Sequence, residues 1–378
     1  MTRRALALVF ALALALRLAV LPWTLPRYDW GRAYPDTAQY EAMARNLLEG
    51  KGLSAGPGAR AVRPPLYPLL LAALRAPLAV ILVQCVMGAA TAVLAAALGG
   101  KWAGLAAALH PELLLWPSLL LSETLAILLV TASLWAAFRA LAAPHPLRWA
   151  LAAGALCGAS ALTRASLLPL AALVGLWLGL AARPGAGLAC LGAAVLVVAP
   201  WMVRNRLVLG AWVPVTTKAG WDLYEQCCDE ADGGPGFGRV RWPRAAYAMG
   251  EVEADRFLRK EALAWIRSHP GRALSLTLER VKRTWNPVPN DAEHRTPGIL
   301  ALSLAVNLPL FSLAAAALLG RRLEPRLLTL ALLPALLLTA VHAVFTGSVR
   351  YRAPALPGLC VLAAAGMAPR RPGTTPCP

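Results

Sequence analysis

Long runs of apolar residues alternate with short polar breaks along most of this chain. A helix needs about 20 predominantly apolar residues to cross the hydrocarbon core of a bilayer, and ten runs approach that length. The runs cover residues 5–22, 77–99, 102–118, 122–142, 147–163, 166–182, 186–203, 298–319, 327–345 and 353–368. The pattern therefore predicts an all-α polytopic membrane protein with about ten transmembrane helices.

Two long polar segments, 23–65 and 204–297, interrupt the apolar runs. They divide the chain into an N-terminal transmembrane module (1–203) that includes the first loop, a second loop (204–297), and C-terminal transmembrane helices with a short tail (298–378). The first loop predicts a helix in which Asp36 caps the N-terminus and Gln39 is its capping-box partner. The second loop predicts two amphipathic helices, 250–268 and 271–285; the latter suits a helix lying on a membrane surface.

Composition agrees with a membrane protein and excludes a soluble or disordered one. Hydrophobic residues make up 58% of the chain, charged residues 15%, and the mean hydropathy is +0.57. Soluble domains carry about 25% charged residues. The seven cysteines include no C-x-x-C spacing, so we expect no structural metal site from them.

The net charge of +18, from 37 basic and 19 acidic residues, is explained by topology without nucleic acid. With the N-terminus in the cytoplasm, the short cytoplasmic loops and termini hold eleven basic residues and the single acid Glu324, as the positive-inside rule requires. The eleven are Arg3, Arg4, Lys101, Arg139, Arg148, Arg183, Arg321, Arg322, Arg326, Arg370 and Arg371. We therefore expect a multi-pass protein of the cytoplasmic (inner) membrane with both termini in the cytoplasm, the two long loops outside, and no nucleic-acid partner.

Ionisable residues at the ends of membrane spans are costly unless they meet water, a partner or a ligand. Six such residues fall at the predicted outer boundary, from five separate stretches: Asp36, Glu123, Arg164, Arg204, Arg350 and Arg352. Together, acids and guanidinium groups form the kind of site that binds a phosphate-bearing lipid and deprotonates a hydroxyl.

Each of these residues also has a structural interpretation. Asp36 could be only a helix cap, and Glu123 an acid favoured by the dipole of a helix N-terminus. Each arginine could simply extend its guanidinium to lipid headgroups. The functional interpretation rests on the joint pattern of all six.

Several motifs, in order, resemble bacterial membrane glycosyltransferases related to the protein O-mannosyltransferase and aminoarabinose (ArnT-like) transferase families, of glycosyltransferase family 39 type. The motifs are Asp36-x-x-x-Tyr40, Gly50-Lys51-Gly52, Arg63-Pro64-Pro65-Leu66-Tyr67-Pro68, Ser122-Glu123, Leu162-Thr163-Arg164, Pro200-Trp201-Met202-Val203-Arg204-Asn205, His269-Pro270 and Arg350-Tyr351-Arg352-Ala353-Pro354. They extend over about residues 1–368. The resemblance implies the GT-C fold, a polyprenyl-phosphate-linked sugar donor, and a lipid, glycan or protein acceptor at the outer face.

The chain departs from that family in two ways. The mannosyltransferases carry paired acids in the first loop, whereas Asp36 lies between Pro35 and Thr37. Participation of a divalent metal ion is therefore an open question. Because the last predicted span ends at residue 368, we also expect no large soluble C-terminal domain.

The sequence leads to a mechanistic hypothesis of inverting glycosyl transfer. Asp36 would take the acceptor proton, while Arg350 and Arg352 would hold the leaving phosphate, with Arg164 and Arg204 as second choices. Glu123 would support Asp36 or help hold a cation. The alternatives are a transporter or flippase for a lipid-linked saccharide, which predicts ionisable residues along mid-membrane helix faces, and a non-catalytic membrane scaffold.

Overall fold

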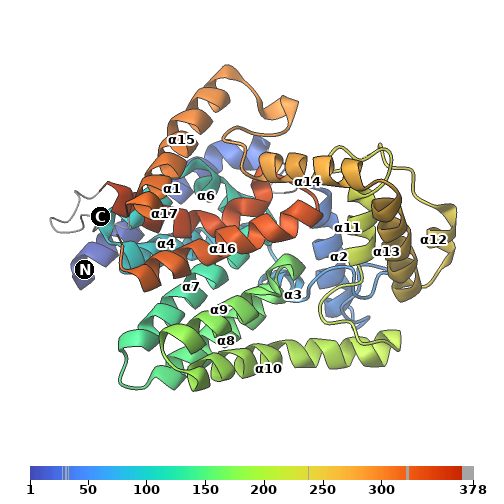
Figure 1. The fold of residues 1–378 in the computed structure, drawn as a ribbon, viewed down its shortest axis with the longest axis horizontal. Helices are drawn as coiled ribbons and strands as arrows, with labels where there is room; N and C mark the ends of the chain where they lie inside the picture. The colour runs from blue at the N-terminus through green and yellow to red at the C-terminus, as the bar shows by residue number, and fades with distance from the viewer. Residues whose placement is uncertain (28, 30–31, 33, 237, 321–322, 368–378) are drawn as a thin grey trace.

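The computed structural model describes residues 1–367 except 28, 30–31, 33, 237 and 321–322, and within this part every regular element is a helix (Figure 1). The prediction of an all-α fold is confirmed for these residues. Arg321, Arg322, Arg370 and Arg371, which contribute to the predicted orientation, lie outside them.

Six of the predicted spans are confirmed as helices long and apolar enough to cross a membrane. They are α1 (Arg3–Arg27), α4 (Pro77–Gly99), α7 (Glu123–Ala142), α10 (Pro184–Leu209), α15 (Pro297–Leu319) and α16 (Pro325–Val344). Several begin with proline in their first turn, where the missing N–H costs no intrahelical hydrogen bond. The protein is therefore an all-helical protein with several candidate transmembrane segments.

The other four predicted spans are shorter or broken helices, so the number of ten stays a prediction. The run 102–118 becomes α5 (Lys101–Leu109), α6 (Pro111–Leu115) and the 3₁₀ turn η2 (Trp116–Ser118). The break falls at His110, whose backbone is extended, as expected for a residue before proline. The remaining elements are α8 (Pro146–Ala161), η3 (Ala165–Leu167) with α9 (Leu170–Ala181), and η5 (Val349–Ala355) with α17 (Leu356–Gly366).

Glycines allow the helices of the bundle to approach closely. Gly154 of α8 faces the backbone of Cys190 in α10, and Gly358 of α17 faces the backbone of Ala331 in α16; a Cβ at either glycine would overlap a carbonyl oxygen. Small residues at such contacts are typical of membrane helix packing, which depends on van der Waals contact. Nearly all of α17 is buried at the centre of the bundle.

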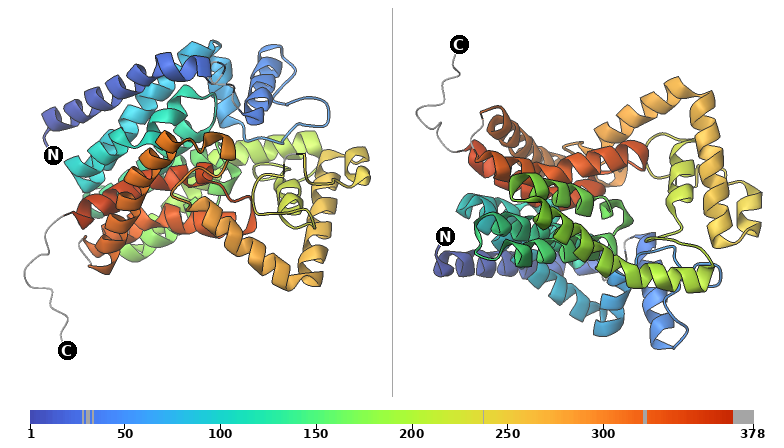
Figure 2. Two further views of the ribbon diagram at one scale, coloured as in Figure 1. Left: turned by 90° about the horizontal axis from the view of Figure 1, so that it is seen from above. Right: turned by 60° about the horizontal axis from the view of Figure 1, so that its bottom comes forward.

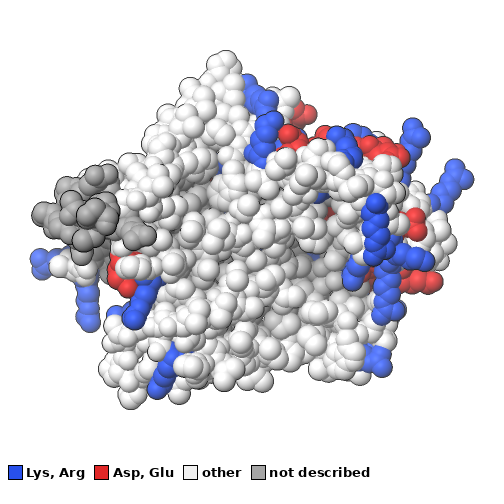
Figure 3. Space-filling view, in the orientation of Figure 1, with Lys and Arg blue, Asp and Glu red and all other residues white. Residues whose placement is uncertain are grey.

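The polar helices gather at one end of the bundle. They are α2 (Pro35–Leu48), α11 (Ala219–Gln226), α12 (Arg244–Ala248), α13 (Glu251–Ser268) and α14 (Pro270–Thr284), and we call this the polar end. The start of α1 and the end of α17 lie at the opposite end (Figures 1 and 2). On the face drawn in Figure 3, charged side chains occupy the two ends, and a broad belt without charge separates them.

The two amphipathic helices predicted in the second loop are confirmed as α13 and α14. In α14, Leu274 and Leu278 are exposed, whereas Arg280 is buried and donates to the carbonyl oxygen of Ala343 in α16 (2.9 Å). The leucines of α14 thus face outward, as a helix at a membrane surface requires. The short α3 (Leu66–Leu74) connects α2 to α4.

The predicted capping role of Asp36 is wrong. Helix α2 begins at Pro35 with Tyr34 as its N-cap, and no side chain caps it. Because the helix begins at Pro35, two residues earlier than a cap at Asp36 would allow, Asp36 falls inside the first turn. Its carboxylate and the amide of Gln39 instead contact Arg63.

Candidate functional site

Asp36 is held between two arginines that are distant from it in sequence. Arg63 Nη2 donates to Asp36 Oδ1 (2.5 Å), and Arg350 Nη2 donates to Asp36 Oδ2 (2.8 Å). Arg63 Nε also donates to Gln39 Oε1, one turn further along α2 (2.6 Å). Both carboxylate oxygens of Asp36 therefore accept a charge-assisted hydrogen bond.

Glu123 is the second carboxylate of the site, and its side chain is completely buried. Its Oε1 accepts from Arg164 Nη1 (2.7 Å) and from Arg350 Nε, while its Oε2 has no hydrogen-bond partner. Arg350 thus bridges the two acids. We call Asp36, Glu123, Arg63, Arg164 and Arg350 the acid–arginine cluster.

The local backbone structure around each of the five cluster residues explains how their side chains come together. Asp36 and Glu123 each lie in the first turn of a helix, where the helix dipole favours negative charge. Arg63 precedes two prolines that end the first loop, and Arg164 is extended between α8 and η3. Arg350 lies in η5, whose first turn is capped by the hydroxyl of Ser348.

Aromatic rings enclose the guanidinium groups of the cluster. The Arg350 guanidinium lies 4.8 Å from the ring centre of Tyr34, and that of Arg164 lies 5.3 Å from the ring centre of Tyr351. Tyr351 in turn stacks on His342, at 4.6 Å between ring centres. These contacts add cation–π attraction and restrict the arginine side chains without neutralising their charge.

The cluster carries an unmatched positive charge, because three guanidinium groups face two carboxylates. Burial acts to raise the pKa of Asp36, but the charges of Arg63, Arg350 and Lys218 outweigh burial and hold that pKa well below its usual range. Lys218 itself pairs with Asp222 (2.7 Å). Asp36 is therefore ionised at neutral pH, and the site has excess positive charge with which to attract an anion.

Asp36 is the most accessible member of the cluster, with 23% of its side chain exposed against 12% for Arg350 and none for Glu123. A separate hollow of about 330 Å³ lies at the start of α2, lined by Arg32, Tyr34, Pro35, Thr37, Ala38 and Glu41, and no member of the acid–arginine cluster is among its lining residues. A molecule that approaches from the polar end would meet Asp36 before Glu123.

Arg352, predicted to hold phosphate with Arg350, lies in a different environment. Its side chain is 1% exposed and donates to Glu112 Oε1 of α6 (2.5 Å) and to backbone carbonyl oxygens of Thr284 and Asn286. The two arginines point to different sides of η5 because they are only two residues apart in a 3₁₀ turn. Arg352 thus fastens η5 to α6 and to the end of α14.

Arg204 is also separate from the cluster. Its guanidinium donates to the carbonyl oxygens of Arg60 (2.8 Å) and Leu53 (2.6 Å), and it lies over the ring of Trp201. It therefore ties the first loop to the end of α10. Of the six residues predicted at the outer boundary, the structure brings together Asp36, Glu123, Arg164 and Arg350, and it leaves Arg352 and Arg204 outside.

Arg63 is the site residue that sequence reasoning missed. Arg63 belongs to the motif that contains the paired prolines. Because it was predicted to lie in a loop, nothing in the local sequence indicated that it contacts Asp36, 27 positions earlier. A weak signal was available, since an arginine at the end of a polar loop and next to a predicted span has the same boundary position as Arg164. Lys218 gave no such signal.

Among the described residues, no group of three or more His, Cys, Asp or Glu side chains is close enough to hold a metal ion. Comparison of the chain with protein-family models, curated proteins and solved structures gives no match. The resemblance to family 39 glycosyltransferases therefore rests on the sequence motifs alone.

Proposed function

We propose that the protein is an integral-membrane glycosyltransferase that moves a sugar from a polyprenyl-phosphate donor to an acceptor hydroxyl. The observation that carries the proposal is the convergence of an accessible carboxylate, Asp36, with Arg63, Arg164 and Arg350 at one end of the bundle. This combination supplies a proton acceptor and an anion-binding group within one site.

Arg350 is the arginine best suited to bind the donor phosphate. It bridges Asp36 and Glu123, so it can turn toward an incoming phosphate while each acid keeps a second arginine, Arg63 or Arg164. A guanidinium group binds phosphate oxygens through two parallel hydrogen bonds and offsets the charge that grows as the leaving bond breaks. Arg352 and Arg204 have structural roles in this scheme.

Donor binding would also activate Asp36. An aspartate paired with two arginines is a weak base, because its proton affinity is far below the optimum for catalysis near neutral pH. Transfer of Arg350 from Asp36 to the phosphate removes one of these cations and raises the pKa of the carboxyl group. Proton transfer is therefore coupled to donor binding.

The reaction itself follows from these positions. The acceptor oxygen attacks the anomeric carbon as the bond between that carbon and the phosphate oxygen breaks. The acceptor proton passes to Asp36, and the electron pair of the broken bond remains on polyprenyl phosphate. A single displacement of this kind inverts the anomeric configuration.

The polar end that carries the site lies opposite the start of α1 and the end of α17. With the termini in the cytoplasm of the cell, as the positive-inside rule predicts, the site would face outward from the cytoplasmic membrane. Such a site would use a donor whose sugar has already crossed the membrane.

The alternative of a saccharide transporter predicts ionisable groups along a path through the membrane. Arg17, at mid-span in α1, is 1% exposed and donates to carbonyl oxygens of Ala13 and Ala107. Its guanidinium lies against Gly88, where even a Cβ would overlap it. These contacts favour a role for Arg17 in packing α1 against α4 and α5.

A reconstitution experiment separates the two functions. Purified protein in liposomes receives a panel of polyprenyl-phosphate hexoses and pentoses together with a membrane extract as the source of acceptors. We expect release of polyprenyl phosphate with at least one donor. Movement of intact donor between leaflets, without cleavage of any donor in the panel, would instead support the transporter.

A further inference from the structure

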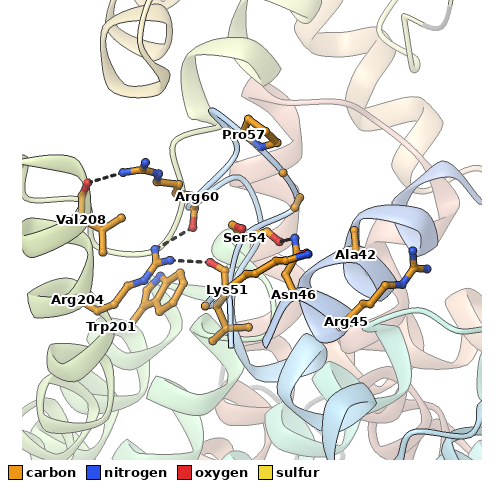
Figure 4. Close-up of a pocket in the computed structure, with 14 residues that line it drawn as sticks. Ala42, Arg45, Asn46, Lys51, Ser54, Pro57, Arg60, Trp201, Arg204 and Val208 are labelled. Atoms are coloured by element: carbon orange, nitrogen blue, oxygen red, sulfur yellow. Dashed lines mark hydrogen bonds between the residues drawn. The ribbon is translucent and has the colours of Figure 1, made fainter. Parts of the chain in front are cut away.

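A second cavity lies between the C-terminal half of α2, the first loop and the end of α10 (Figure 4). Its volume is about 1050 Å³, roughly three times that of the hollow at the start of α2. It is enclosed by the C-terminal half of α2, the loop 51–60 and the end of α10. We call it the loop cavity.

The lining of the loop cavity contains four basic residues, Arg45, Lys51, Arg60 and Arg204, and no acid. Arg204 and Arg60 hold its walls together: Arg204 donates to two loop carbonyls, and Arg60 Nη1 donates to the carbonyl oxygen of Val208 (3.2 Å). Arg45 makes no ion pair with a described residue, and Lys51 pairs only with the exposed Glu49. Arg45 and Lys51 thus have charge available for an anionic ligand.

The loop cavity is separate from the acid–arginine cluster because the two lie on opposite faces of α2. Asp36 and Arg45 are nine residues apart, which is two and a half turns at 3.6 residues per turn. Asp36 faces Arg63 and Arg350, whereas Arg45 and Asn46 line the cavity. A ligand bound there would not have its phosphate at the proposed reaction centre.

The loop cavity adjoins apolar surface at the end of a membrane span. Trp201 and Val208 of α10 line it, and Val208 is 37% exposed. Leu207, one turn beyond Arg204, and Val203 are also exposed. Figure 2 shows α10 extending beside α2 toward the polar end. The cavity therefore has basic side chains that could bind the anionic headgroup of a lipid, and the adjoining surface has apolar side chains that could contact the acyl chains of the same lipid.

We infer that the loop cavity binds the phosphate headgroup of an anionic membrane lipid, whose chains lie along the exposed side of α10. The ligand is an amphiphile and not a soluble phosphate compound because the basic lining continues into exposed apolar side chains at the membrane boundary. Polybasic groups at this level attract anionic headgroups. This inference goes beyond the proposed transferase and does not depend on it.

The test uses native mass spectrometry of purified full-length protein in detergent. Phosphatidylglycerol, zwitterionic phosphatidylcholine and inorganic phosphate are titrated separately. The variant is Arg45→Gln/Lys51→Gln, which removes two exposed cations without touching the arginines that hold the loop. The control is Lys260→Gln/Arg267→Gln, which removes two exposed cations from α13.

We expect phosphatidylglycerol to bind the wild-type protein more tightly than phosphatidylcholine. The Arg45/Lys51 variant should lose at least about tenfold in affinity for phosphatidylglycerol, because the loss of even one of its two charge-assisted contacts has that effect. The control should bind like wild type. Equal binding of phosphatidylglycerol by variant and wild type would overturn the assignment of the site. Binding of inorganic phosphate, but not of the lipid, with the same dependence on Arg45 and Lys51 would replace the lipid with a soluble phosphate compound.

Discussion

Asp36 is both the proposed proton acceptor and a member of a structural ion-pair cluster. Which of the two roles it can fill depends on its pKa, and its arginine neighbours set that pKa. In the structure, Arg63 and Arg350 hold its pKa well below the usual range even though burial opposes them. A carboxyl group with a lowered pKa contributes stability above its unfolded pKa and loses that contribution only as the pH falls through its folded value. Acidification from neutral pH to about 4, the ordinary pKa of aspartate, should therefore leave the cluster intact.

The pH profile of the reaction tests this electrostatic balance. With Arg63→Gln, the carboxylate of Asp36 loses one of its cations, so its pKa rises, although Arg350 and Lys218 still lower it. The acidic limb that Asp36 contributes to kcat/KM for the donor should therefore lie at higher pH in Arg63→Gln than in the wild-type protein. Arg32→Gln is the matched control, because Arg32 pairs with Glu41 at the surface. Superimposable profiles for Arg63→Gln and wild type would show that Arg63 does not set the pKa of Asp36.

Metal removal provides a second test at the same residues. In the structure, the two oxygens of Asp36 and one oxygen of Glu123 accept from guanidinium groups, which supply the positive charge that a divalent ion would bring to a donor phosphate. We therefore expect release of polyprenyl phosphate to persist after treatment with a chelator. A loss of activity that added Mg²⁺ or Mn²⁺ restores would show that a metal ion replaces one of the arginine contacts during the reaction.

At the scale of elements, hydropathy and length were enough to predict the long apolar helices and the amphipathic helices from the sequence. They did not predict the helix break at a proline or the partners of the buried arginines. Six predicted spans became long helices, and α13 and α14 match the predicted amphipathic helices closely. The run 102–118 looked continuous, but Pro111 divides it. The partners of Arg63 and Arg352 depend on segments that are far apart in sequence, so no local pattern could identify them.

The packing of α8 against α10 depends on a glycine that only the structure identifies. A Cβ at Gly154 would overlap the carbonyl group of Cys190, so Gly154→Ala should separate the helices and cost about 1–3 kcal/mol, as overpacking does elsewhere. That cost corresponds to a fall in Tm of several degrees. Gly192→Ala is the control on α10, because nothing lies within 4 Å of its Cβ position. Equal Tm values for the two variants, measured by thermal unfolding in detergent, would refute the close contact.

At the scale of the whole molecule, the charged residues are concentrated at the two ends of the helical bundle, and the candidate site lies at one of these ends. Basic residues gather at both ends on the face shown in Figure 3, and the acid–arginine cluster lies at the polar end. The basic residues at the polar end include those of the acid–arginine cluster and of the loop cavity. That the basic residues at the opposite end set the orientation stays a prediction from the sequence, which also placed Arg204 and Arg352 at the reaction centre.

Cysteine labelling in intact cells tests the orientation. The six cysteines in the described part of the chain are all buried, and Cys377→Ser removes the seventh, so single cysteines introduced into that variant can report on each end. Lys260→Cys in α13 should react with a membrane-impermeant maleimide applied from outside. Arg148→Cys, at the start of α8, should react only after the membrane is permeabilised. The reverse pattern would place the acid–arginine cluster on the cytoplasmic side.

The most direct test of the central claim is the rate of sugar transfer by Asp36→Asn, measured as polyprenyl phosphate released from the donor that wild-type protein accepts. Asparagine keeps the size of the side chain and removes its ability to take a proton, so we expect the rate to fall by about 100-fold or more. Glu41→Gln, which neutralises another acid on α2, should retain the wild-type rate. A folded Asp36→Asn protein that transfers sugar as fast as Glu41→Gln would contradict the proposed role of the cluster.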